Sequence, residues 1–256
     1  MAYTVAFAGK GGTGKTTITG MMIDWLCKSG KTPVLAVDAD ANSNLNEVLG
    51  VEVETTLGDI REIIAESDMD DNTPIPPSMS KKEYLDYKFN SALVEDDDFD
   101  LIVMGRTQGK GCYCFVNDLL SAQLRKLEGN YKYMLVDNEA GMEHISRGIL
   151  PSVNLIVLVS DCSRRGIQAV GRIAELCGEM KLGQDRIVLI VNRAPNGELN
   201  EGIKEEIAKY GLDLIGVVPQ DGDVYEYDCD GTPTATLGDD NPARKAVNEI
   251  AEKLFN

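Results

Sequence analysis

The fold is decided by the stretch Gly9-Lys10-Gly11-Gly12-Thr13-Gly14-Lys15-Thr16-Thr17, which fits the pattern G-x-x-x-x-G-K-[ST]. It directly follows a strand-like apolar run and opens an amphipathic helix. The glycines let the backbone curl so that successive N–H groups point at phosphate oxygens, and the helix N-terminus adds its positive end. In this motif the lysine, here Lys15, reaches the β- and γ-phosphates, and the hydroxyl of Thr16 binds Mg²⁺. The stretch therefore predicts a binding site for the phosphates of ATP or ADP with Mg²⁺.

Short β-rich runs alternate with helical patterns along almost the whole chain. Several runs are continuous in Val, Ile and Leu, as expected of strands buried on both faces of a parallel sheet. The predicted strands are Thr4–Ala8, Val34–Val37, Asp100–Met104, Tyr133–Val136, Asn154–Val159, Arg186–Val191 and Leu214–Val218. Apolar stripes at helical spacing lie between them, at residues 18–26, 115–127 and 167–177. This alternation predicts an α/β fold, a doubly wound and mostly parallel sheet with helices on both faces.

The length of 256 residues suits one domain, and we expect a single P-loop domain over residues 1–256. Residues 66–98 break the alternation because they are acidic and contain three prolines, with one helix expected near Lys81–Leu93. We interpret them as a surface insertion. The last helix, with Val247, Ile250 and Leu254 on one face, is expected to dock on the core.

The composition limits the partners. The chain has 43% hydrophobic and 26% charged residues, which is ordinary for a globular protein, and its net charge of −17 argues against nucleic acid or an anionic membrane as a partner. The longest apolar run, Leu155–Val159, is far too short to span a bilayer. The N-terminus has neither a basic start nor a cleavage site, so we expect a cytoplasmic protein whose six cysteines are reduced.

Lys10, the second residue of the loop, is typical of the deviant P-loop ATPases, and the chain resembles that family. The family includes the septum-site (MinD) and plasmid-partition (ParA) ATPases, the nitrogenase iron protein and nickel-insertion ATPases. In these proteins the lysine reaches across a dimer to the partner's phosphates. The resemblance implies that Lys10 is catalytic and that ATP promotes a homodimer.

Carboxylates follow two of the predicted strands. Asp38 and Asp40 stand at the carboxyl end of the second strand, where the phosphate crevice of such a sheet lies. The resemblance implies that Asp38 lies near the Mg²⁺ shell and that Asp40 orients the attacking water. Asp137-Asn138-Glu139-Ala140-Gly141 keeps the family's D-x-x-A-G pattern, which implies that Asp137 lies on the Mg²⁺ side and that Gly141 senses the γ-phosphate.

Two further loops resemble the segments that contact adenine in this family. Asn192-Arg193 follows one strand, and Pro219-Gln220-Asp221 follows the next. Asn and Pro are also common turn residues after strands, so ordinary turns are the alternative interpretation of both segments.

Cys112 and Cys114 form a Cys-x-Cys pair at the start of a predicted helix, beside Lys110. A helix N-terminus and a nearby cation favour the thiolate, which is the metal ligand. Two sulfurs are too few for a tetrahedral site, but a two-fold dimer doubles the count to four, which suits Zn²⁺ or Ni²⁺. Two semi-buried cysteines in a loop are the simpler interpretation.

The remaining cysteines and the single histidine carry less information. Cys177 lies on a core stripe and Cys27 ends a helix, so both are expected to be packing residues. His144 is expected to cap or pack, and Cys162 and Cys229 have no assigned role.

The P-loop, the cysteine pair and the segment Asp137–His144 together resemble the CooC-type nickel-insertion ATPases over nearly the entire chain. That resemblance implies a metallochaperone that delivers nickel to carbon monoxide dehydrogenase, or to the related acetyl-CoA synthase. The nitrogenase iron protein fits less well, since after Gly141 no cysteine occurs before Cys162. An iron–sulfur scaffold ATPase and a MinD/ParA-like interaction switch without metal cargo remain as alternatives.

Overall fold

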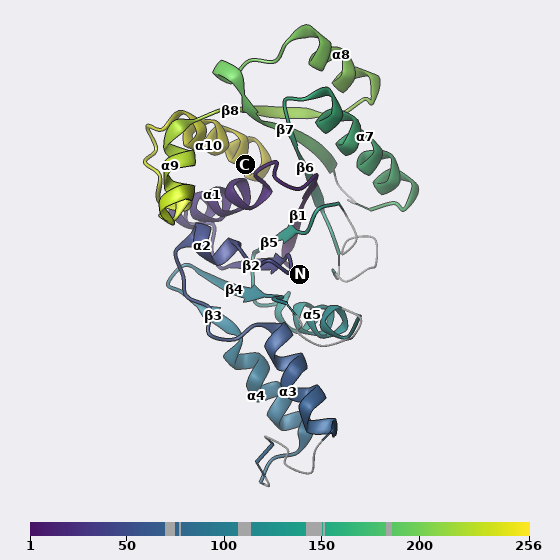
Figure 1. Ribbon diagram of the computed structural model, residues 1–256, viewed down its shortest axis with the longest axis vertical. Coiled ribbons are helices and arrows are strands. Elements are labelled where there is room, and N and C mark those ends of the chain that lie inside the picture. Colours follow the sequence, from purple (N-terminus) through teal and green to yellow (C-terminus); the bar gives the residue numbers. More distant parts are fainter. Residues whose placement is uncertain (70–74, 77, 107–113, 142–149, 151, 183–185) are drawn as a thin grey trace.

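The computed structural model describes residues 1–69, 75–76, 78–106, 114–141, 150, 152–182 and 186–256. An eight-stranded sheet runs through it in the order β3-β4-β2-β5-β1-β6-β7-β8 (Figure 1). The strands are β1 (Tyr3–Gly9), β2 (Val34–Ala39), β3 (Leu93–Glu95), β4 (Phe99–Val103), β5 (Tyr133–Asn138), β6 (Leu155–Asp161), β7 (Arg186–Ala194) and β8 (Leu214–Pro219). Neighbouring strands are parallel except β3, which is antiparallel to β4. The predicted doubly wound, mostly parallel sheet is confirmed.

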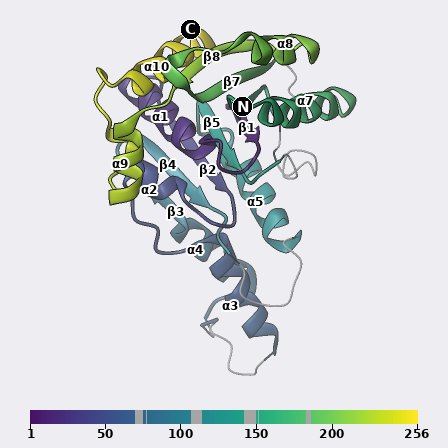
Figure 2. The same ribbon diagram turned by 45° about the horizontal axis from the view of Figure 1, so that its top comes forward.

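Helices cover both faces of this sheet (Figures 1 and 2). The helices are α1 (Lys15–Lys28), α2 (Leu45–Leu49), α3 (Leu57–Met69), α4 (Lys81–Ser91), α5 (Cys114–Leu127), α7 (Arg164–Glu179), α8 (Glu201–Lys209), α9 (Gly222–Asp230) and α10 (Pro242–Phe255). Side chains of α1, α2, α9 and α10 pack in the hydrophobic core on one face. Those of α3, α5, α7 and α8 pack in the core on the other.

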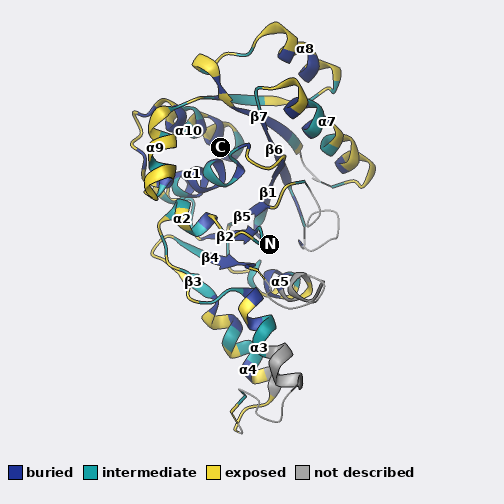
Figure 3. Ribbon diagram, in the orientation of Figure 1, coloured by how far each residue is buried: buried dark blue, intermediate teal, exposed yellow. Residues whose placement is uncertain are grey.

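The central strands are apolar without alternation because both of their faces are covered. β1 is buried from Thr4 to Gly9, and β2 along its whole length (Figure 3). The predicted stripe of α1 is confirmed, since Ile18, Met21 and Leu26 are buried. The docking of the last helix is also confirmed by the burial of Val247 and Ile250.

The segment between β2 and β4 contains more structure than the sequence predicted. Helix α4 occupies the expected place, but α3 begins ahead of the segment 66–98, and β3 forms an antiparallel edge strand within that segment. β3 is only three residues long and is followed directly by acidic residues, so it shows no hydrophobic periodicity from which a strand could be predicted. α3 and α4 extend away from the sheet at this edge (Figure 1).

The topology places the loop after β1 at the switch point of the sheet. β1 lies between β5 and β6, and the chain continues to opposite sides of it, which leaves a crevice at the carboxyl ends of these strands. Among the described residues, no helix is both long and apolar enough to span a membrane.

Candidate nucleotide-binding site

The P-loop runs from the end of β1 at Gly9 to the start of α1 at Lys15. Gly14, the residue before the helix, has a left-handed backbone with φ of 86°. A Cβ atom at Gly14 would also lie 2.3 Å from Nδ2 of Asn192. Both the backbone conformation and the close approach therefore require glycine here. Inside the loop, the Thr13 hydroxyl donates to the Lys10 carbonyl at 2.9 Å.

The N-terminus of α1 is left open for an anion. Gly14 offers no side chain to cap the helix, and the first turn contains no acidic residue. By contrast, α7, α8, α9 and α10 are each capped by a side chain, from Ser163, Asn200, Asp221 and Asn241 respectively. The uncapped N–H groups and the helix dipole of α1 are thus directed at the loop, where phosphate oxygens would accept from them.

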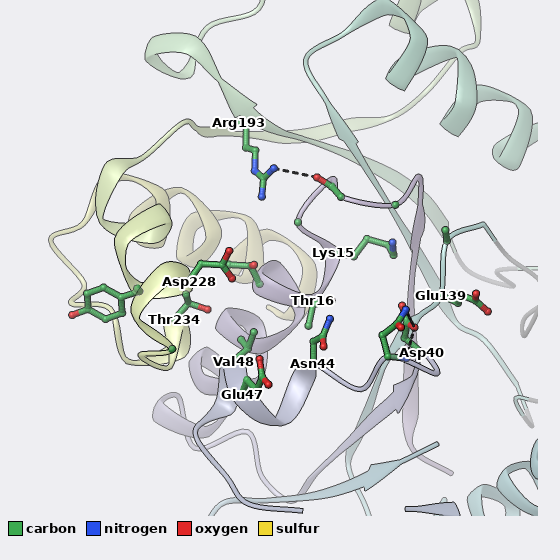
Figure 4. Close-up of a pocket in the computed structure, with 18 of the residues that line it drawn as sticks. Lys15, Thr16, Asp40, Asn44, Glu47, Val48, Glu139, Arg193, Asp228 and Thr234 are labelled. Carbon is green, nitrogen blue, oxygen red and sulfur yellow. Dashed lines mark hydrogen bonds between the residues drawn. The ribbon is translucent and has the colours of Figure 1, made fainter. Parts of the chain in front are cut away.

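A cavity of about 490 Å³ lies over this helix end (Figure 4). The P-loop contributes Gly11, Gly12, Gly14, Lys15, Thr16 and Thr17 to its lining. Asp40 and Glu139 line one side of it, while Glu47, Asp228 and Thr234 line the other. Glu139 occupies an unspecified position of the D-x-x-A-G pattern and had no predicted role. Glu47, Asp228 and Thr234 belong to no motif, and only the fold brings them to the loop.

Two buried carboxylates lie beneath the P-loop, at the ends of the adjacent strands β2 and β5. Asp38 and Asp137 are paired in register. The Thr16 hydroxyl donates to Oδ2 of Asp137 at 2.6 Å, while Oδ1 of Asp137 is buried with no hydrogen-bond partner. Burial raises the pKa of Asp137 to about 7, with the charge of Asp38 adding to the shift. Burial also raises the pKa of Asp38 to about 6.

These residues fit Mg²⁺. The ion prefers hard oxygen ligands and is usually held by one or two carboxylates together with substrate phosphates. The Thr16 hydroxyl and the unpartnered Oδ1 of Asp137 supply such oxygens next to the phosphate cavity. Within the described ranges, no group of three or more His, Cys, Asp or Glu side chains could hold a metal ion.

The raised pKa of Asp137 predicts how the stability of the nucleotide-free protein depends on pH. Between about pH 4 and about pH 7 the folded state binds more protons than the unfolded state, so the free energy of unfolding should fall as pH rises. Asp137→Asn should reduce this slope, and chemical unfolding at pH 5 and pH 8 measures it. The exposed Asp118→Asn is the control. Equal slopes in wild type and Asp137→Asn would contradict the assigned environment.

Asp40 lies at the edge of the cavity, in the turn after β2. Its backbone N–H donates to Oδ1 of Asp38 at 3.0 Å, which fixes the turn on the buried carboxylate. Its own Oδ1 accepts from the backbone N–H of Asn42 at 2.8 Å and from Nδ2 of Asn42 at 3.1 Å. The carboxylate therefore lines the same cavity as Lys15 and Thr16 (Figure 4).

The segment after β5 is attached to the P-loop. The N–H of Gly141 donates to the carbonyl of Gly9 at 3.0 Å, and the two residues form an isolated bridge. Asn138 is buried, and its Nδ2 donates to the carbonyl of Phe7 at 2.9 Å. These bonds fix the end of β5 to β1 and to the start of the loop.

A second cavity, of about 480 Å³, adjoins the first and is lined largely by apolar side chains. Met21, Val218, Val224 and Val247 line it, together with the predicted adenine-contacting residues Asn192, Arg193, Pro219, Gln220 and Asp221. Thr17, Arg193 and Asp228 line both cavities. An apolar cavity connected to a phosphate-binding loop suits the base of a nucleotide.

Asn192 and Arg193 brace the P-loop, which the sequence did not predict. Nδ2 of Asn192 donates to the carbonyl of Thr13 at 2.9 Å, and Oδ1 of Asn192 accepts from the Arg193 N–H. Nη1 of Arg193 donates to the carbonyl of Gly12 at 3.1 Å (Figure 4). Arg193 also has a left-handed backbone with φ of 55°, which is uncommon for a residue with a side chain.

The second predicted adenine loop is also tied into the fold. The N–H of Gln220 donates to the carbonyl of Ala194 at 2.9 Å, which joins the loops after β7 and β8. The carboxylate of Asp221 caps α9 and accepts from Nδ2 of Asn241 at 2.9 Å. Asp221 thus shapes the wall of the second cavity through α9 and α10.

Among the remaining predicted residues, Lys10 has an exposed side chain in the loop itself and does not line either cavity. Cys112 and His144 lie outside the described residues, and Cys114 is the first residue of α5. Cys177 is buried, as predicted, and burial raises its thiol pKa to about 11. Burial also raises the thiol pKa of Cys27 to about 12, so both residues stay protonated.

A glycine-rich loop between β1 and α1, two buried carboxylates and adjoining phosphate and base cavities define a P-loop nucleotide-binding protein. The chain belongs to the CbiA family, the CobQ/CobB/MinD/ParA nucleotide binding domain, whose family model matches residues 4–234.

The chain is similar to several individual members of this family and to related solved structures. An uncharacterised ATP-binding protein of Methanocaldococcus jannaschii is 40% identical over 98% of both chains. The carbon monoxide dehydrogenase accessory protein CooC of Rhodospirillum rubrum is 29% identical, over 89% of this chain and 87% of its own length. The septum site-determining protein MinD of Pyrococcus horikoshii, solved with Mg-ADP, has a TM-score of 0.74 at 22% identity, covering 100% of this chain and 97% of that one.

Proposed function

We propose that this protein is an ATPase that dimerises around ATP and delivers nickel to carbon monoxide dehydrogenase or a related enzyme. The observation that supports hydrolysis best is the joint placement of the open N-terminus of α1, Lys15 and the carboxylate of Asp40 around one cavity. The relative named as an ATP-binding protein supports ATP as the nucleotide. The relative CooC, a carbon monoxide dehydrogenase accessory protein, supports that enzyme as the target.

In the proposed reaction a water oxygen attacks the γ-phosphorus of ATP, and the bond to the bridging β–γ oxygen breaks to release ADP and phosphate. The N–H groups of residues 11–16 hold the phosphates, and the Lys15 ammonium neutralises the charge that develops on the β- and γ-oxygens. Asp40 accepts a hydrogen bond from the attacking water and orients it. Mg²⁺, when bound by Thr16 and Asp137, supplies further neutralisation of phosphate charge.

Lys10 extends the proposal to a dimer. Its exposed ammonium does not line the cavity of its own protomer. We infer that it contacts the phosphates bound by a second copy, so that two sites are completed together and hydrolysis requires both protomers. A two-fold arrangement also brings two copies of the pair Cys112 and Cys114 together, which gives four thiolates for one Ni²⁺ or Zn²⁺ ion.

The cargo is tested by replacing the cysteine pair. The double variant Cys112→Ser/Cys114→Ser should lose the bound ion, which in wild type should amount to one Ni²⁺ or Zn²⁺ per two protomers with ATP present. Metal titration with and without ATP, monitored together with molar mass, measures both quantities. The exposed Cys229→Ser is the matched control and should bind as wild type does.

Two results would redirect the proposal. Unchanged metal stoichiometry in the double variant would remove nickel delivery and leave a nucleotide-controlled interaction switch of the MinD/ParA type. Visible absorption of an iron–sulfur cluster after anaerobic purification would instead favour a scaffold for such clusters.

A further inference from the structure

The turn that carries Asp40 is held from outside the nucleotide cavity by an arginine. Oδ1 of Asp40 accepts two hydrogen bonds from Asn42, one from its backbone N–H and one from Nδ2. Oδ1 of Asn42 in turn accepts from Nη2 of Arg106. Three side chains from two different segments are thus linked by hydrogen bonds, and the last of them is the carboxylate that lines the cavity.

The backbone that carries Arg106 is fixed by its neighbours. Directly after β4, the N–H of Met104 donates to the carbonyl of Asp38 at 2.8 Å, and the Met104 carbonyl accepts from the N–H of Gly58 at 2.8 Å. A Cβ atom at Gly58 would lie 2.3 Å from the carbonyl oxygen of Arg106, so the start of α3 packs directly on this backbone. Arg106 therefore reaches Asn42 from an anchored position next to β2.

The chemistry of the three side chains gives this series of hydrogen bonds a fixed donor-to-acceptor direction, from Arg106 to Asp40. A guanidinium only donates hydrogen bonds, and a carboxylate only accepts them. The amide of Asn42 has to turn its oxygen to Arg106 and its nitrogen to Asp40 in order to satisfy both. Without the guanidinium, the Asn42 side chain would be held on one side only, by its Nδ2 bond to Asp40, and the carboxylate would lose the anchored contact that fixes its orientation.

We propose that Arg106 is a positioning residue for ATP hydrolysis, acting through the Asn42 amide on the carboxylate of Asp40. This inference rests on the proposed function, because it assigns Asp40 to the attacking water. With Oδ1 held by Asn42, the second carboxylate oxygen is the one presented to the water. Arg106 does not line the cavity, so it acts on the rate of the chemical step and not on nucleotide affinity.

If Arg106 had a purely structural role, Arg106→Ala would lower the unfolding temperature, whereas a positioning role lowers kcat alone. Arg106 and Asn42 have exposed side chains, and exposed polar contacts contribute little to the free energy of unfolding. Arg106→Ala should therefore unfold at the same temperature as wild type. It should lower kcat roughly 10- to 100-fold, the range expected when a catalytic group is misplaced. KM for ATP and the affinity for ADP should stay within about twofold of the wild-type values, since the groups that bind the phosphates are unchanged.

The experiment is a double-mutant cycle on ATP hydrolysis with Arg106→Ala, Asn42→Ala and the double variant. Because both residues act through one contact, the double variant should be no slower than the slower single variant. Arg106→Lys, which keeps a donor, should recover part of kcat. Asn42→Asp, which cannot donate from its side chain to Asp40 when ionised, should be as slow as Asn42→Ala. Arg172→Ala, at an exposed arginine of α7, is the matched control and should match wild type.

The outcomes separate this inference from the function on which it rests. Wild-type kcat in Arg106→Ala, or losses that multiply in the double variant, would overturn the role of Arg106 while leaving the ATPase intact. Absence of hydrolysis by the wild-type protein would overturn both. If Arg106→Ala does not fold, Arg106→Lys and Asn42→Asp decide the question, and wild-type kcat in Asn42→Asp would overturn the inference.

Discussion

Replacing Lys15 by alanine is expected to lower ATP hydrolysis by at least roughly 100- to 1,000-fold, the cost of removing one donor from a transition state that develops charge. Lys15 is buried at the start of α1, and its Nζ lies 3.4 Å from the carbonyl of Lys10, inside the loop. Its ammonium therefore points back along the P-loop, and Lys15 lines the cavity over the start of α1. Among the described residues, the other cation that lines the cavity is Arg193, whose Nη1 donates to the carbonyl of Gly12.

The same change should also weaken nucleotide binding, because the lysine contacts the β-phosphate in the ground state as well as in the transition state. Phosphate release and the binding of a fluorescent ADP measure the two effects. Lys28→Ala removes a lysine from the other end of the same helix, where Nζ pairs with Asp24 at 2.9 Å, and should leave both values unchanged. Wild-type turnover in Lys15→Ala would show that the loop does not carry the reaction.

Replacing Asp40 by asparagine is expected to abolish turnover while leaving nucleotide bound. The asparagine keeps an oxygen that can accept the two bonds from Asn42, so the turn after β2 should keep its shape. It lacks the negative charge that makes Asp40 a strong acceptor for the attacking water. The expected loss in kcat is again roughly 100-fold or more.

The role of Asp40 in orienting the water is recognised by a loss of hydrolysis without a loss of nucleotide affinity. Asp40→Asn should bind ADP and ATP with wild-type affinity and retain ATP unhydrolysed, which single-turnover measurements detect. Asp213→Asn, at an exposed aspartate that pairs with Arg186, is the control. Hydrolysis at the wild-type rate in Asp40→Asn would assign the water to another group, and Glu139 lines the same side of the cavity.

The sequence predicted the parts of the fold that depend on local periodicity. The seven predicted strands are all present, because buried parallel strands are continuous apolar runs that are easily distinguished from the helices around them. β3 was missed because its stability comes from pairing with β4 and not from its own residues. The helix α3 was missed although Leu57, Ile60 and Ile64 stand at helical spacing, because its end runs into the acidic segment that we interpret as an insertion.

The site was predictable where a motif is contiguous in sequence. The P-loop follows β1, and Asp38 and Asp137 lie at the carboxyl ends of β2 and β5, which the topology brings to the same edge of the sheet. Glu47, Asp228 and Thr234 come from α2, α9 and the turn after α9, and only the packing of these elements on α1 brings them to the cavity. The bracing of Thr13 by Asn192 spans 179 residues, which no local pattern encodes.

The most direct test of the central claim is phosphate release from ATP by the wild-type protein, with and without Mg²⁺, over a range of protein concentrations. We expect release that requires Mg²⁺, that is absent in Lys15→Ala, and whose rate per protomer rises with protein concentration as dimers form. Tight binding of ATP without any release of phosphate at the highest concentration would contradict the account, and would leave a protein that binds nucleotide without hydrolysing it.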